Sequence, residues 1–194
     1  MNDIILFGIP WAGKGTQAEL LKYYMQDNYV HLSTGDVFRA LLSSPNAIGD
    51  LVQARMNAWL LINDKVSMSL FDVYFYSVIE QHKYMLLDWY PRSIPQLNNF
   101  LSRAYDYERS LTGIYFDLPE DVAIKRMLSR ARDGETIDVI RTRMEKYHKT
   151  TAPIMQAYAA QQRLITIDAS GTEEEVHQLV IAALKLVQGS LDQD

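Results

Sequence analysis

Five short apolar runs alternate with longer segments of helical periodicity along the chain. Runs of this length between polar turns are typical of strands buried in a parallel sheet, and the intervening helices supply the crossovers. The pattern predicts an α/β fold in which helices cover both faces of the sheet and each crossover is right-handed. The predicted strands are 3–7, 29–32, 84–88, 113–118 and 164–168.

One segment is too long for a single crossover. Residues 34–76 have the pattern of successive helices, interrupted near Pro45-Asn46 and near Asn63-Asp64. A helical stretch of this length predicts a small subdomain inserted between two strands of the sheet.

A second exception is a charged loop at 129–138, between helices predicted at 121–128 and 139–161. Arginines and acids on a loop between firm helices are typical of a mobile cover over a site. The spacing alone favours a solvated interhelical turn, so both interpretations stay open.

Composition restricts the class of protein. The chain has 194 residues, of which 22% are charged and 48% hydrophobic, as in one soluble globular domain. Its net charge of −5 argues against a general nucleic-acid or membrane-surface role. Cysteine is absent, which excludes disulfides and thiolate metal sites. The N-terminal run has the pattern of a core strand rather than a signal peptide, and we expect a cytoplasmic protein.

The most informative motif is GIPWAGKGT at residues 8–16. It follows a predicted strand and precedes a helix predicted at 16–27, the context in which G-x-x-x-x-G-K binds phosphate. Backbone N–H groups of such a loop and the helix N-terminus form a nest for anionic oxygens. Lys14 would reach the terminal phosphates, and Thr16 a magnesium ion or a phosphate.

Further charged residues are placed where phosphate chemistry needs them. Asp88 ends an apolar strand, where it would hold magnesium or, alternatively, cap a helix. Phosphoryl transfer needs alignment and positive charge, and arginine grips two oxygens at once. Any single arginine is more often a surface ion-pair partner, but five or six converging on one phosphate loop favour catalysis. The candidates are Arg39, Arg92, Arg126, Arg130, Arg132 and Arg143.

These motifs together resemble the adenylate kinase family over nearly the full chain, in its short-lid form. GIPWAGKGTQ is similar to the family's G-x-P-G-x-G-K-G-T-Q, and DWYPRSIPQ to D-G-F-P-R-T-x-x-Q. The other matching segments are 31–39, 58–64, 126–135 and 139–154. The resemblance implies a P-loop NTPase-type five-stranded parallel sheet within one domain, 1–194. It divides the domain into a core (1–32, 63–128 and 140–194), a nucleoside monophosphate (NMP)-binding insert (33–62) and a short lid (129–139).

The implied reaction is the reversible transfer of a phosphoryl group from MgATP to AMP, giving two ADP and maintaining the adenine nucleotide pool. The resemblance assigns catalysis to Lys14, Arg39, Arg92, Arg130, Arg132 and Arg143. It assigns ATP binding to Trp11, Ala12, Gly13, Lys14, Gly15, Thr16, Arg126, Arg130 and Gly171. It assigns AMP binding to Thr34, Arg39, Leu60, Leu61, Ile62, Trp89, Tyr90, Pro91, Arg92, Gln96, Arg132 and Arg143. Magnesium would be held by Asp88, through water, and by Thr16, and no zinc is expected.

In the family that the chain resembles, two positions distinguish the enzymes that phosphorylate AMP from those that phosphorylate UMP or CMP. Thr34 and Gln96 are similar to the AMP branch, whereas UMP/CMP kinases usually have Ala and Asn there. The expected partners are therefore ATP, AMP and ADP, with no nucleic acid or membrane, and the expected state is a monomer. A UMP/CMP kinase, a small-molecule kinase and a non-catalytic nucleotide-binding module are the alternatives.

The chain departs from the family at its three tryptophans, Trp11, Trp59 and Trp89, which all occupy family glycine positions. An indole there would fill space meant for nucleotide and would be strained wherever φ is positive. One explanation is a catalytically impaired relative. The other, which we prefer, is a source that reads UGA as glycine, since Lys14 and the named arginines are all retained.

Overall fold

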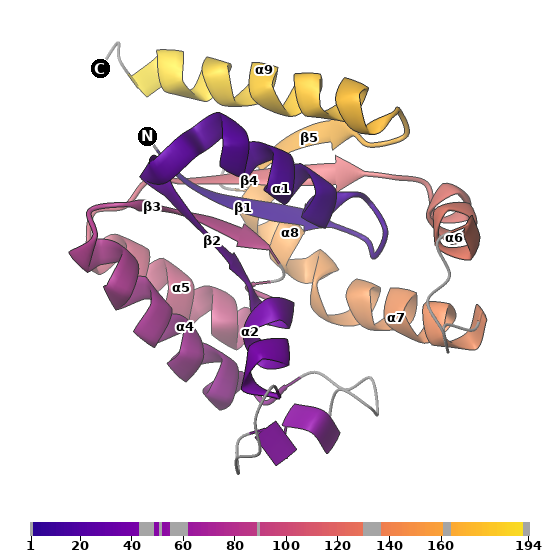
Figure 1. The fold of residues 1–194 in the computed structure, drawn as a ribbon, viewed down its shortest axis with the longest axis horizontal. Coiled ribbons are helices and arrows are strands. Elements are labelled where there is room, and N and C mark those ends of the chain that lie inside the picture. The colour runs from indigo at the N-terminus through magenta and orange to yellow at the C-terminus, as the bar shows by residue number, and fades with distance from the viewer. Residues whose placement is uncertain are drawn as a thin grey trace.

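The computed structural model describes residues 2–42, 49–50, 52–54, 62–88, 90–129, 137–160 and 164–191. Its centre is a five-stranded parallel sheet with the order β2-β3-β1-β4-β5 (Figure 1). The predicted fold class is therefore confirmed. The strands are β1 (Asp3–Gly8), β2 (Tyr29–Ser33), β3 (Tyr84–Asp88), β4 (Leu111–Asp117) and β5 (Leu164–Asp168).

The boundaries of β4 differ from the prediction of 113–118. Leu111 and Thr112 already pair with Asp3 and Ile4, so β4 accompanies β1 along its whole length. Leu118 lies beyond the strand end and precedes Pro119, which has no N–H to continue a ladder.

Helices form a layer on each face of the sheet (Figure 1). On one face lie α1 (Lys14–Met25) and α9 (Glu173–Leu191), whose cluster of buried side chains includes Leu21 and Val180. On the other face lie α4 (Asp64–Glu80), α5 (Ile94–Asp106) and α8 (Ala152–Ala160), with Phe71, Phe100 and Tyr158 buried among them. The remaining described elements are η1 (Gln26–Asn28), α2 (Thr34–Leu41), α6 (Glu120–Ser129) and α7 (Ile137–Thr150).

Two helix predictions need correction. The helix predicted at 16–27 begins at Lys14, because the phosphate loop itself supplies the first helical turn. The single helix predicted at 139–161 is wrong, since α7 ends at Thr150 and α8 begins at Ala152. Pro153 has no N–H to bond the preceding turn, and the Thr151 carbonyl accepts from Ile154 and Met155 to start the new helix.

The predicted insert and lid lie partly outside the described residues. The expected interruption near Asn63-Asp64 is present, because the Asn63 side chain caps α4 by accepting a 2.9 Å hydrogen bond from the Lys65 N–H. The other expected interruption, at Pro45-Asn46, falls outside the described residues. Helix α7 begins at Ile137, so the last three residues of the predicted lid belong to a helix. In the described part of the chain, no helix has the length and apolar character needed to span a membrane.

Candidate active site

The phosphate loop joins the end of β1 to the start of α1 at the carboxyl edge of the sheet. Gly8 has φ 151°, and a Cβ there would lie 2.9 Å from the Phe116 carbonyl oxygen. Gly13 precedes α1 with φ 92°, and a Cβ there would meet no atom within 4 Å. The loop is therefore tightly packed at Gly8 and open at Gly13, where the helix N-terminus can receive an anion.

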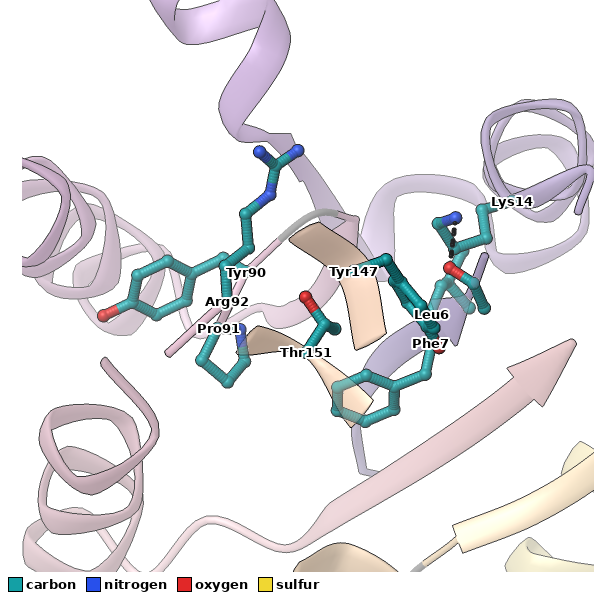
Figure 2. Close-up of a pocket in the computed structure, with 9 residues that line it drawn as sticks. Leu6, Phe7, Lys14, Tyr90, Pro91, Arg92, Tyr147 and Thr151 are labelled. Carbon is teal, nitrogen blue, oxygen red and sulfur yellow. Dashed lines mark hydrogen bonds between the residues drawn. The ribbon is translucent and has the colours of Figure 1, made fainter. Parts of the chain in front are cut away.

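Lys14 is folded into this loop and is only 5% exposed. Its Nζ donates to the carbonyl oxygens of Gly8 at 2.8 Å and Ile9 at 2.9 Å; the dashed line in Figure 2 marks the first. Burial lowers the pKa of Lys14 to about 8, since the attraction of Asp88 offsets only part of the desolvation and Arg92 repels the charge. An anionic ligand at the loop would reverse this shift.

Asp88 lies beneath the start of α1. It ends β3 in register with Leu6 and Ser33 and is 3% exposed. Its Oδ2 lies 3.9 Å from where a Cβ of Gly15 would be. A buried carboxylate beside a phosphate loop is the type of oxygen ligand that magnesium binds through water, and Thr16 is half-buried nearby, so these residues fit the ion. Among the described residues, no three His, Cys, Asp or Glu form a metal-binding group.

Two arginines complete a cluster of charges around Asp88. Burial lowers the pKa of Arg92 to about 10, with Asp88 opposing the shift and Arg143 adding to it. Asp88 thus attracts both Lys14 and Arg92, while Arg92 repels Lys14 and is itself repelled by Arg143, so in this set of described residues the positive charges outnumber the negative one. An excess of cations in a buried site favours a multiply charged anion such as a phosphate chain.

A small cavity of about 20 Å³ separates Lys14 from Arg92, enough for about one water molecule. Tyr147 and Thr151, at the corner between α7 and α8, line this cavity together with residues of β1 and of the segment after β3 (Figure 2). Sequence reasoning did not assign these two residues to the site. The signal that could have found them is Thr151-Ala152-Pro153, which ends one helix and turns the chain toward the loop.

Trp11 lies in the phosphate loop with φ 63°, the left-handed conformation that a glycine adopts without strain. The expected positive φ is therefore present at this tryptophan. The guanidinium of Arg143 lies 5.2 Å from the centre of the indole ring, a cation–π contact. Arg143, expected to act on the transferring phosphoryl group, is thus in contact with the tryptophan.

Arg126 and Gly171, both assigned to the ATP base, are close together. Arg126 Nη2 donates to three successive carbonyl oxygens after β5: Ala169 at 2.9 Å, Ser170 at 3.3 Å and Gly171 at 3.0 Å. Arg126 of α6 therefore holds the loop after β5 by hydrogen bonds, at the same edge of the sheet as the phosphate loop.

The residues expected at the AMP site are described only in part. Gln96 is buried, and its side-chain amide accepts a hydrogen bond from the Arg92 N–H and donates one to Asp64. Ile62 is also buried, whereas Arg39 on α2 is exposed. The backbone of Thr34 begins α2. Trp59, Leu60, Leu61, Trp89, Arg130 and Arg132 fall outside the described residues.

Comparison with known proteins assigns this arrangement to a family. The family described as adenylate kinase matches residues 6–163. A protein of Prochlorococcus marinus (strain MIT 9301) named adenylate kinase is 36% identical over 169 residues, covering 87% of this chain and 90% of the relative. One from Corynebacterium urealyticum (strain ATCC 43042 / DSM 7109) with the same name is 35% identical over 182 residues, covering 93% and 98%. A third, from Cyanothece sp. (strain PCC 7425 / ATCC 29141), is 37% identical over 186 residues, covering 91% of both chains.

The chain belongs to the adenylate kinase family. It is therefore an enzyme of the nucleoside monophosphate kinase type, a phosphotransferase that binds nucleotides. The family match at residues 6–163 includes the phosphate loop, Asp88 and the α7–α8 corner.

Proposed function

We propose that this adenylate kinase family member transfers a phosphoryl group reversibly from MgATP to AMP. An oxygen of the AMP phosphate forms a bond to the γ-phosphorus of ATP, and the bond from that phosphorus to the β–γ bridging oxygen breaks. Both products are ADP, so the enzyme maintains the balance of adenine nucleotides used in biosynthesis. This acceptor follows from Thr34 and Gln96, which resemble the AMP branch rather than the UMP/CMP branch.

The charge excess around Asp88 is the observation that carries this proposal. Lys14 exchanges its bonds to the loop carbonyls for bonds to ATP phosphates, and Arg92 holds the AMP phosphate on the other side of the cavity. Arg143 meets the transferring group, as we also expect of Arg39, Arg130 and Arg132. These cations stabilise charge on the phosphoryl oxygens more strongly because the site is buried.

Asp88, through water, and Thr16 would hold magnesium, which would supply further positive charge to the ATP phosphates. Arg126 and the loop at Gly171 receive the ATP base. We also propose that the protein acts as a cytoplasmic monomer whose partners are ATP, AMP and ADP, without nucleic acid, membrane or zinc.

A coupled assay of ADP formation tests the proposal with ATP and each of AMP, UMP and CMP as acceptor. AMP should exceed either pyrimidine nucleotide in kcat/KM, and Lys14→Met is the inactive control. Equal or better use of UMP or CMP would overturn the acceptor assignment, and ATP binding without acceptor-dependent turnover would favour a nucleotide-binding module.

The tryptophans support a second candidate, a catalytically impaired nucleotide-binding relative. The observation that supports this candidate is the cation–π contact between Trp11 and Arg143. The contact engages an arginine that the proposed reaction needs at the transferring phosphoryl group. The triple variant Trp11→Gly, Trp59→Gly, Trp89→Gly should be more active than the chain with tryptophans if the indoles block the nucleotide sites. Equal activity would show that the tryptophans are harmless.

We further propose that the codons for Trp11, Trp59 and Trp89 are UGA, and that the source organism reads UGA as glycine. A UGG codon at any of the three positions would disprove this, and the intact mass of the native protein gives an independent check. In that case the native protein is the active kinase and the tryptophan form is a weakened version of it.

A further inference from the structure

A closed network of hydrogen bonds joins the start of α4 to the segment between β3 and α5. The backbone N–H of Arg92 donates to Gln96 Oε1, and Gln96 Nε2 donates to Asp64 Oδ1, both at 2.8 Å. Ser93 Oγ donates to the same oxygen of Asp64 at 2.9 Å and accepts from the Gln96 N–H at 3.4 Å. Gln96 is 3% exposed and its partners are half-buried, so these bonds are partly shielded from water.

The network determines which way the Gln96 amide points. A backbone N–H can only donate, so the amide atom that faces Arg92 must be the oxygen. A carboxylate can only accept, so the atom that faces Asp64 must be the nitrogen. Turning the amide over would place donor against donor and acceptor against acceptor in a buried position, which is costly.

Among the described residues, one hydrogen of Nε2 and one lone pair of Oε1 have no further partner and can serve a ligand. In adenine, the N6 amino group donates and the neighbouring N1 accepts, which matches this pair. Hypoxanthine, the base of inosine monophosphate (IMP), has the opposite pattern, because its O6 accepts and its N1–H donates. A Gln96 amide held in one orientation therefore distinguishes the two bases, whereas an amide that can turn does not.

We propose that Asp64 is a positioning residue that sets the preference for an adenine base by holding the Gln96 amide in one orientation. The inference rests on the proposed function, in which Gln96 contacts the base of AMP. Asp64 acts through Gln96 and has no contact with the reacting phosphates in this role.

The backbone around Asp64 is suited to this task. Asp64 is the first residue of α4, next to the Asn63 cap, where a carboxylate also interacts favourably with the helix dipole. Helices α4 and α5 pack side by side (Figure 1). Asp72 of α4 accepts hydrogen bonds from Asn99 and Arg103 of α5. The two helices are thus joined at two places along their length, which keeps Asp64 at a fixed distance from Gln96.

The test compares equilibrium binding of AMP and IMP by calorimetry without ATP, so that it does not depend on turnover. The variants are Asp64→Ala, which removes the acceptor, and Asp64→Asn, whose oxygen can still accept from Gln96 and Ser93. Asp72→Ala is the matched control, because it removes a carboxylate of the same helix that bonds the same neighbouring helix. The set is measured in the chain as it stands and in the background with all three tryptophans changed to glycine.

In Asp64→Ala the ratio of AMP to IMP affinity should fall about fivefold, the size expected for one hydrogen bond. Asp64→Asn should keep most of the ratio, and Asp72→Ala should leave it unchanged. If Asp64→Ala weakens both nucleotides equally, Asp64 is only structural and the inference fails while the proposed function stands. If neither background binds AMP, the proposed function fails and the inference fails with it.

Discussion

The two ends of the sheet both bury charge, but they balance it differently. At the amino end, Arg109 bonds both carboxylate oxygens of Asp3 and the Lys83 carbonyl, while Asp3 also accepts from the Met85 N–H. Burial acts to lower the pKa of Arg109, but the bond and charge of Asp3 outweigh it and raise the pKa. This cation is matched by its partner within the fold, whereas desolvation outweighs the same bond at Asp3 and raises the pKa of its carboxyl.

At the carboxyl end, Lys14 and Arg92 share the attraction of Asp88, Arg143 repels Arg92, and the pKa values of Lys14 and Arg92 are both lowered. A lowered pKa means that the folded chain holds these positive charges at a cost in free energy. The difference teaches that the pKa of a buried cation rises where the bond and charge of a carboxylate outweigh desolvation, and falls where desolvation outweighs the attraction of the carboxylate.

Lys14→Met should give the largest effect at the carboxyl end. We expect kcat for ADP formation to fall about 10³-fold, because one donor to the phosphates is lost from a buried site. The free energy of unfolding should stay equal or rise, because a buried cation has been removed. Urea unfolding checks the second part, and a large loss of stability would break the contrast between the two ends.

Asp3→Asn should have the opposite profile. It leaves Arg109 buried without a countercharge, which should lower the free energy of unfolding by about 3 kcal/mol. The kcat of the folded enzyme should not change. Adding Arg109→Met to this variant should restore much of the stability, and a loss below about 1 kcal/mol in Asp3→Asn would contradict our view of the pair.

The pH dependence of stability should reveal the cost of Lys14. Its pKa is about 8 in the folded chain and 10.5 for an ordinary lysine, so the unfolded chain binds more protons in this interval. Stability should therefore rise as pH increases from 8 to 10.5, by about 1 kcal/mol per pH unit at most. Comparison with Lys14→Met isolates this slope from the titration of tyrosines, and identical pH profiles would contradict the lowered pKa.

Trp11→Gly should show the smallest of these effects, about a fivefold gain in kcat/KM for ATP. The substitution frees Arg143 from a cation–π contact of about 1 kcal/mol and relieves the left-handed backbone. His82→Gly is the matched control, because His82 has a similar φ of 53° but is exposed and far along the chain from the loop. An equal gain in both variants would assign the effect to backbone strain rather than to Arg143.

Sequence patterns were sufficient where one local rule decides the structure. The runs at 84–88 and 164–168 match the strands at both ends, and the phosphate-loop motif correctly predicts a turn between strand and helix. The break at Asn63 also follows from a local rule, the preference of Asn for helix caps.

Features that depend on distant parts of the chain were not predictable in this way. Thr151 lies in the cavity because Pro153 breaks a periodic apolar pattern that otherwise continues through both helices. The role of Asp64 depends on Gln96, which is brought near only by the packing of α4 against α5. Periodicity gives the face on which a residue lies but not the partner it meets.

The strand order has a consequence for synthesis on the ribosome. β4 pairs with β1 on one side and with β5 on the other. Helix α1 packs against α9, and the Gln17 side-chain amide of α1 donates a hydrogen bond to the Glu173 carbonyl oxygen of α9. Until residues 164–191 have been translated, the nascent chain has an open edge at β4 and an uncovered apolar face at α1. Completion of the sheet thus waits for the synthesis of β5 and α9, and in the interval the nascent chain is a natural client for a chaperone.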